Sequence, residues 1–202
     1  MRSALLVALL AIFAARADAA PAPDRYGHMH MLYERTWFGV DVANIDVWFD
    51  ATTRDRLREL AQDQRYSDPL AERIARTALD ASDVTVQVQF LRNADLGEFL
   101  DAARKNLERA RNAGYISPAT FATAWAGVKK DFASLAERGF HKGDRLIYHA
   151  RSGALQTTVI SGGRVLLDVT SLDEGSRRSM IASYFAPKSD FRKGLITDLF
   201  HR

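Results

Sequence analysis

The stretch "VTVQVQF", residues 84–90, decides the fold class. Val84, Val86, Val88 and Phe90 occupy every second position, and threonine or glutamine stands between them. Because successive side chains of a strand point to opposite faces, this stretch predicts a strand with one buried and one solvated face. Such a strand is typical of an antiparallel sheet. The rest of the chain must then supply neighbouring strands and a cover for the buried face.

The residues that follow this strand predict two helices. Asp95 with Glu98 forms a capping box that starts a helix ending near Gly114. Ser117–Pro118 starts a second helix, which continues to Gly139. Both helices carry apolar residues at steps of three and four, so each has one apolar side. We expect them to lie as an antiparallel pair on the sheet.

The second half of the chain predicts more strands and then two more helices. "GDRLIYHARSGALQTTVISGGRVLLDV" contains three short strands separated by turns at Ser152–Gly153 and Gly162–Gly163. A helix capped by Ser171 follows, and a short amphipathic helix ends the chain. Residues 52–79 are charged and favour helix. Because strands and helices are grouped and do not alternate strictly, we predict an α+β fold: an antiparallel sheet with helices packed on one face.

The stretch "GHMHMLYERTWFGVDVANIDVWFD", residues 27–50, also has strand composition. Its alternation changes phase at Val42 and Ala43, where two apolar residues are adjacent. We predict one long, bent strand here. Either a β-bulge near Val42 and Ala43 restores a single apolar face, or the strand is buried on both faces.

The first residues predict a secretory signal peptide over 1–19. Arg2 precedes an apolar run, and small residues stand where a cleavage site is expected. The mature domain would then be residues 20–202. The chain contains no cysteine, which excludes a lipid-anchored lipoprotein and a disulfide-stapled mini-domain. We therefore expect a periplasmic domain.

The charge balance argues against nucleic acid as a partner. The formal net charge is +3, and it becomes +2 without residues 1–19, because Arg2, Arg16 and Asp18 are removed with them. A nucleic-acid binding domain usually has a clustered basic face, and the charges here are evenly mixed. No later stretch has the roughly 20 continuous apolar residues that a membrane-spanning helix needs.

The order of elements and four segments resemble the chalcone isomerase fold, and in particular bacterial exported chalcone isomerase-like proteins. The segments are "RTWFGVDVANIDVWF", "VTVQVQFLRNADLGEFLDAARKN", "FHKGDRLIY" and "SMIASYFAPKSDFRKGLITDLF". The resemblance spans about residues 30–200. It implies a ligand cleft between the sheet and the helices. In the plant enzymes of this family, a phenolate of the substrate closes a ring in that cleft.

The resemblance also implies site residues. Arg35 matches the arginine that leads into a strand in this family, and its donor fork suits a phenolate or a carboxylate. Phe99 stands where the plant enzymes carry a tyrosine, Asn106 where they carry an asparagine, and Ser183 matches a small hydroxyl residue that lines the cleft. The plant threonine falls on Asp41, and a negative charge there argues against the isomerase reaction.

Each of these residues has a structural interpretation as well. Arg35 could be an exposed arginine paired with Glu34 or another nearby carboxylate, since most arginines are exposed. Asn106 could be a solvated helix residue. Trp125 lies in an apolar stripe at helical spacing, which favours a core position, although a cleft wall would carry the same residues.

The leading hypothesis is a non-catalytic binder of a small apolar ligand with an anionic or phenolic head, such as a fatty acid, without a cofactor. In this hypothesis Arg35 holds the head of the ligand, and Phe99, Trp125 and neighbouring aromatic residues surround its body. Asn106 and Ser183 add polar contacts. A fatty acid is implied by resemblance alone, because some non-catalytic plant relatives bind one. The alternatives are an intramolecular lyase or isomerase that uses the same cleft, and a structural interaction module whose cleft is filled by its own side chains.

The segment from His28 to Met31 suggests a metal site, but its spacing argues against one. On a strand, His28 and His30 point to one face and the two methionines to the other, so the four cannot easily converge on one ion. A flexible segment would bring them together more easily, and copper favours imidazole and thioether ligands. A closed metal site usually needs a third or fourth ligand. The serines near the C-terminus lack a nucleophile-elbow motif, and no glycine-rich phosphate loop is present.

Overall fold

The computed structural model of the chain describes residues 26–34 and 41–200. Six strands form one antiparallel sheet in which their spatial order equals their chain order. The strands are β1 (His28–Glu34), β2 (Asp41–Phe49), β3 (Asp83–Phe90), β4 (Arg145–Arg151), β5 (Ala154–Ser161) and β6 (Arg164–Ser171). The helices are α1 (Ala51–Ala61), α2 (Asp68–Leu79), α3 (Leu96–Asn112), α4 (Pro118–Asp131), α5 (Glu174–Phe185) and α6 (Arg192–Asp198), with a 3-10 turn, η1 (Phe132–Leu135), after α4. The predicted α+β class is confirmed.

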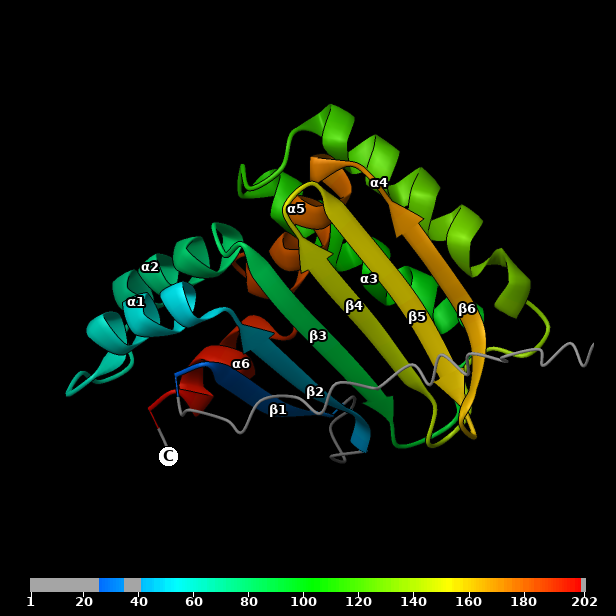
Figure 1. Ribbon diagram of the computed structural model, residues 1–202, viewed down its shortest axis with the longest axis horizontal. Coiled ribbons are helices and arrows are strands. Elements are labelled where there is room, and N and C mark those ends of the chain that lie inside the picture. The colour runs from blue at the N-terminus through cyan, green and yellow to red at the C-terminus, as the bar shows by residue number, and fades with distance from the viewer. Residues whose placement is uncertain (1–25, 35–40, 201–202) are drawn as a thin grey trace, which may run out of the picture.

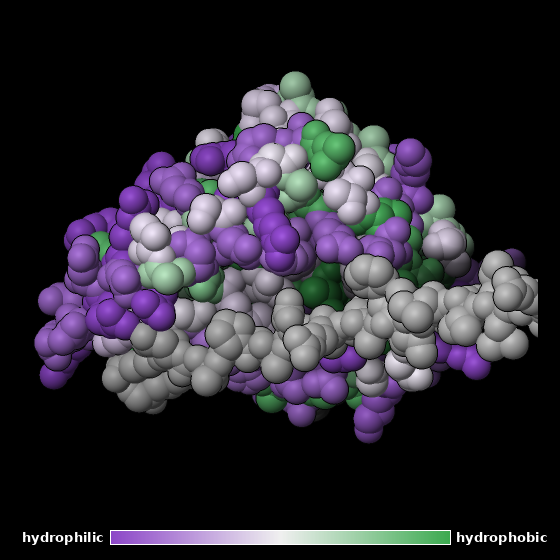
Figure 2. Space-filling model, in the orientation of Figure 1, coloured by the Kyte–Doolittle hydropathy of each residue, from purple (hydrophilic) through white to green (hydrophobic). Residues whose placement is uncertain are grey.

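One face of the sheet is buried and the other is largely hydrophilic. Val84, Val86, Val88 and Phe90 of β3 are all buried, and the residues between them are half-buried. Antiparallel pairing aligns the apolar positions of neighbouring strands on the same face, so the alternation of β3 extends across the sheet. Figure 2 shows the outer face as mostly hydrophilic, with apolar colours toward β6 and α4.

The helices cover the buried face. α3, α4 and α5 lie behind the sheet in Figure 1, and α1 and α2 lie beside one end of β2 and β3. α6 packs against the edge strand β1, where Asp198 accepts a hydrogen bond from the backbone N–H of His30 at 2.8 Å. None of the helices in the described ranges is both long and apolar enough to cross a membrane.

The prediction of one long strand over residues 27–50 is wrong, because this stretch forms two antiparallel strands, β1 and β2. Residues 35–40, which connect them, lie outside the described residues, as does the proposed signal peptide. The apolar alternation continues on both sides of the connection, so periodicity alone gave no sign of a reversal. The predicted bulge is confirmed: Tyr33 pairs with Ala43 and Glu34 pairs with Asp41, which leaves Val42 as the extra residue.

The local helix signals were mostly correct. The side chain of Asp95 accepts a hydrogen bond from the N–H of Glu98 at 2.7 Å, and Ser117 caps α4. The expected cap at Ser171 is wrong, since Ser171 is the last residue of β6 and Asp173 caps α5. The strand persists to Ser171 because β5 supplies its hydrogen-bonding partner there.

Candidate functional site

A cavity of about 370 Å³ lies between the inner face of the sheet and helices α3, α4 and α5. Most residues that line it are apolar. Its helical wall contains Ala102 and Ala103 on α3 and Ala124 and Gly127 on α4. These small side chains leave space that leucine or phenylalanine at the same positions would fill. The volume is within the range of small-molecule sites.

Aromatic rings form one wall of the cavity. The ring of Phe99 lies 4.8 Å from that of Phe132 and 4.9 Å from that of Phe140, between ring centroids. Phe90 stacks on Phe140 at 4.2 Å. Phe132 and Phe140 are almost fully buried, so this cluster is a fixed part of the core. It gives the cavity a rigid apolar wall beside α3.

Two cationic side chains line the cavity among the described residues, Arg92 and Lys130. Arg92 follows β3, and its Nη2 lies 3.6 Å from Oε2 of Glu98, which also lines the cavity. The Nε of Arg92 is buried and has no hydrogen-bond partner within the described part of the chain. A buried guanidinium N–H without a partner can bind an acceptor from a ligand. Lys130 is exposed at the rim of the cavity.

Two further tyrosines line the cavity, Tyr148 of β4 and Tyr184 of α5. Burial raises the pKa of the Tyr184 phenol. Burial also raises the pKa of Tyr148 well above its ordinary value, and the nearby Tyr184 and Asp131 raise it further. Both phenols therefore stay protonated at neutral pH, and they can act as hydrogen-bond donors.

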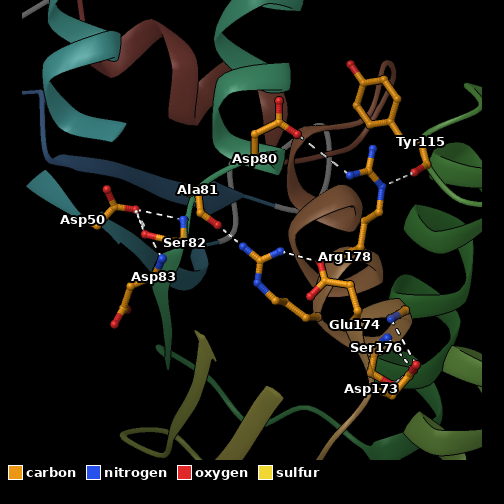
Figure 3. Close-up of polar contacts among 12 residues, drawn as sticks. Asp50, Asp80, Ala81, Ser82, Asp83, Tyr115, Asp173, Glu174, Ser176 and Arg178 are labelled. Atoms are coloured by element: carbon orange, nitrogen blue, oxygen red, sulfur yellow. Dashed lines mark hydrogen bonds and ion pairs between the residues drawn. The ribbon is translucent and has the colours of Figure 1, made fainter. Parts of the chain in front are cut away.

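The helix α5, which carries several cavity residues, is held in place by polar contacts at its first turns (Figure 3). Asp173 accepts hydrogen bonds from the first backbone N–H groups of the helix. Arg178 donates from Nε to the carbonyl oxygen of Tyr115 at 2.9 Å. The buried Arg177 donates to the carbonyl oxygen of Ala81. These contacts tie α5 to the ends of α2 and α3, which fixes its cavity side chains relative to the sheet.

In the same region, the carboxylate of Asp50 joins the β2–α1 connection to the start of β3 (Figure 3). Asp50 caps α1 by accepting from the backbone N–H of Thr53 at 2.8 Å, and it also accepts from those of Ser82 and Asp83 at 3.0 and 3.2 Å. Burial alone would raise the pKa of Asp50, but these hydrogen bonds outweigh burial and lower the pKa to about 2. The carboxylate therefore fastens the β2–α1 connection to the start of β3.

Three residues expected from the family resemblance line the cavity: Phe99, Asn106 and Ser183. Asn106 is buried, and its Oδ1 accepts from Nη1 of Arg109 at 2.9 Å and from the N–H of Asp190 at 3.2 Å. Ser183 donates to the carbonyl oxygen of Met180 at 2.7 Å. Because the protein itself uses these polar atoms, Asn106 mainly joins α3 to the connection between α5 and α6.

The other expected residues are placed elsewhere. Asp41 is exposed at the start of β2 and does not line the cavity. Trp125 is half-buried and packs against the core, and Nζ of Lys129 lies 5.6 Å from its ring centroid, but it does not line the cavity either. The side of α4 that faces the cavity carries Ala124 and Val128 instead. Arg35 lies outside the described residues.

Sequence reasoning missed Arg92, Tyr148, Ser179 and Tyr184 as cavity residues. A signal existed for Tyr148, because the alternation of "RLIYHAR" places it on the same face as buried apolar residues of β4. Arg92 stood in a segment that carried the family resemblance. No local pattern marked Ser179 or Tyr184, since helical spacing cannot distinguish a core position from a cavity wall.

His28 and His30 share one acceptor on the outer face of the sheet. Nε2 of His28 and Nδ1 of His30 lie 2.7 and 3.0 Å from the same oxygen of Asp46, and His28 stacks on Trp48 at 5.1 Å. Met29 is fully buried on the opposite face, as the alternation required. Within the described ranges, no group of three or more histidine, cysteine or acidic side chains is arranged to hold a metal ion.

The comparisons with known proteins give a fold and no family. No known protein family matches the chain, and no curated protein matches it. Among solved structures, the chain is similar to a fatty-acid binding protein of Arabidopsis thaliana, with a TM-score of 0.57 and 11% identity over 87% of this chain and 84% of that one. At this identity the similarity shows the fold alone. The chain has the chalcone isomerase-like α+β fold that the sequence implied.

Proposed function

We propose that this chain binds one small, largely apolar molecule with an anionic or phenolic head, of the fatty-acid class, and does not transform it. The observation that carries the proposal is the cavity of about 370 Å³ between sheet and helices, with its apolar walls. The structural neighbour is named a fatty-acid binding protein, which supports the same class of ligand. The proposal includes the periplasm as the place of binding, as expected from the first 19 residues.

Arg92 is our candidate for holding the head of the ligand. Its guanidinium lines the cavity, its Nε lacks a partner among the described residues, and its contact with Glu98 is long at 3.6 Å. A carboxylate or phenolate entering the cavity would gain a charge-assisted hydrogen bond from it. Arg35 remains a second candidate on the basis of the family resemblance.

Native mass spectrometry of the protein purified from its own host tests the proposal first. A bound mass of a few hundred daltons that disappears on denaturation is expected. Displacement of a fluorescent fatty acid by saturated fatty acids of increasing length then measures affinity. A clean ligand-free spectrum together with no displacement by any fatty acid would refute the proposal, and it would favour a structural module.

A variant that fills the cavity provides the matched test. Ala124 is 6% exposed and lines the cavity, so Ala124→Phe should occupy ligand space and weaken displacement at least tenfold. Ala122 is exposed on the same helix, so Ala122→Phe should bind like the wild type. Equal affinities in the two variants, with both folded by circular dichroism, would place the ligand outside the cavity.

The role of Arg92 is separable from that of the apolar walls. Arg92→Gln should weaken binding of a fatty acid about tenfold and leave its methyl ester unchanged, because only the acid carries the charge. Arg104→Gln is the control, since Arg104 lies exposed on α3 and pairs with Glu108 at 3.0 Å. If Arg35→Gln alone shows the acid-specific loss, the head binds at Arg35 and not at Arg92.

A further inference from the structure

Four hydroxyl groups border the cavity without a hydrogen-bond partner in the described part of the chain. Tyr148 and Thr157 are direct cross-strand partners on β4 and β5, and Ser179 and Tyr184 lie on α5, which packs against both strands. We call these four residues the hydroxyl cluster. Thr157, Ser179 and Tyr184 are 5%, 1% and 6% exposed, respectively. The Oγ of Ser179 is buried and has no partner among residues 26–34 and 41–200, and the other three hydroxyls form no hydrogen bond with any residue in these ranges.

An arrangement of this kind is costly unless something else supplies the acceptors. A buried hydroxyl that makes no hydrogen bond costs about 1–3 kcal/mol, and most buried polar atoms in native proteins have a partner. The Oγ of Ser179 is such a buried group, and the other three hydroxyls belong to residues that line the same largely apolar cavity. Water or a polar atom of a ligand must satisfy them, and a ligand that brings an acceptor gains what the free cavity lacks.

The electrostatics of the hydroxyl cluster favour an uncharged acceptor. The inner faces of β4 and β5 carry no lysine or arginine. The two arginines of α5, Arg177 and Arg178, donate to the carbonyl oxygens of Ala81 and Tyr115 outside the cavity. Asp131 lines the cavity close enough to Tyr148 to act on its charge. Of the two cations that line the cavity within the described residues, Lys130 is exposed and Arg92 follows β3, so neither lies on the elements that carry the hydroxyl cluster.

The backbone positions of Tyr148 and Arg92 are well separated along the sheet. Tyr148 pairs with Val86, and Phe90 is four residues further along β3, a distance of about 13 Å at the rise of a strand. Arg92 follows Phe90 by two residues. A ligand with an apolar spacer between its two polar functions fits this separation.

We infer that the bound molecule carries, besides its anionic head, an uncharged oxygen such as a ketone or hydroxyl on its apolar body, and that this oxygen accepts hydrogen bonds from Tyr148, Ser179 and Tyr184. The natural ligand is then an oxygenated fatty acid and not a plain saturated one. This inference rests on the proposed function, because it concerns the same cavity. It adds the chemical feature that the hydroxyl cluster selects.

The test compares dodecanoic acid with oxododecanoic acids in which the ketone is moved one carbon at a time along the chain. In displacement titrations on the full chain, at least one oxo isomer should bind tenfold or more tightly than dodecanoic acid. One new hydrogen bond is worth about 1 kcal/mol, so two of them suffice for this factor. The dependence on ketone position should show a single maximum, because the spacing to the head is fixed.

The variant Tyr148→Phe/Tyr184→Phe should reduce that preference to less than twofold while dodecanoic acid still binds, and Ser179→Ala should reduce it in part. Tyr66→Phe is the control, since Tyr66 packs at the core surface away from the cavity. If dodecanoic acid and every oxo isomer bind the wild type equally, the inference is wrong and the proposed function stands. If no fatty acid of either kind binds, both are wrong.

Discussion

Replacing Gly139 with alanine tests how closely the segment before Phe140 packs against the start of α3. Gly139 has a φ of +63°, and a Cβ there would lie 2.5 Å from the carbonyl oxygen of Ala94 and 3.0 Å from the Cα of Asp95. That carbonyl accepts from the N–H of Phe140 at 2.8 Å, and the N–H of Ala94 donates back to the carbonyl oxygen of Phe140 at 2.9 Å. The clash therefore falls on the two hydrogen bonds that hold the start of α3 against Phe140.

The magnitude follows from these contacts. A side chain in the left-handed region costs about 1–2 kcal/mol, and losing two hydrogen bonds costs about 1 kcal/mol each. Gly139→Ala should therefore lower the free energy of unfolding by about 3–4 kcal/mol, the sum of these two costs. Gly114 is the matched control, because it also follows a helix with a positive φ of +75°, but a Cβ there would have no neighbouring atom within 4 Å. Gly114→Ala should cost only about 1–2 kcal/mol, which is the backbone cost alone.

Equilibrium urea unfolding measures the stability of both variants. The midpoints can be compared if the dependence of the unfolding free energy on urea concentration is the same as in the wild type. We expect the urea midpoint of Gly139→Ala to lie clearly below that of Gly114→Ala. If the two variants lose stability equally within about 0.5 kcal/mol, the close approach to Ala94 does not matter, and the left-handed backbone alone explains the cost. If Gly139→Ala leaves the free energy of unfolding unchanged, both the left-handed backbone at Gly139 and its close approach to Ala94 are refuted.

Three other substitutions test polar contacts that join separate elements of the fold. Asp50→Asn should lower the free energy of unfolding by about 1 kcal/mol at pH 7. The fall in the pKa of Asp50 from 3.8 to about 2 corresponds to at most about 2 kcal/mol, and solvent screening of this half-exposed carboxylate reduces that value. Because a lowered pKa stabilises the fold above the unfolded value, the difference from the wild type in urea unfolding should hold from pH 7 to about 4 and shrink as the pH falls through about 2. Arg138→Met should cost about 3 kcal/mol in thermal unfolding, since it leaves the carboxylate of Asp144, 2% exposed, without the arginine that it contacts at 2.7 Å; a cost below about 1 kcal/mol would show that the pair is dispensable. Asn106→Leu should lower the free energy of unfolding by about 2 kcal/mol, because the backbone N–H of Asp190 loses its acceptor. Hydrogen exchange at this amide should become faster, and an unchanged exchange rate would show that Asn106 does not join α3 to the segment before α6.

The fold class could be predicted because its signals are local. The alternation of residues 84–90 was enough to require a one-sided sheet, and the bulge at Val42 followed from two adjacent apolar residues. The site was harder to predict. Asn106 was expected to contact the ligand, yet its side-chain Oδ1 accepts hydrogen bonds from Arg109 and Asp190. Asp190 is far from Asn106 in the sequence and lies near it only in the folded chain. Trp125 had the right type and spacing for a cavity wall, but α4 is rotated so that Ala124 faces the cavity.

The sequence by itself determined which segments are strands and helices and which face of each is apolar, because backbone geometry fixes the period and a cap such as that of Asp95 needs only residues three positions apart. Tertiary structure decided that residues 27–50 reverse direction between two strands, since only pairing across the sheet distinguishes a hairpin from one long strand. It also decided that Arg92, Tyr148 and Tyr184 border one cavity. These residues come from three separate elements, and their meeting depends on how the helices pack on the sheet, which no local pattern encodes.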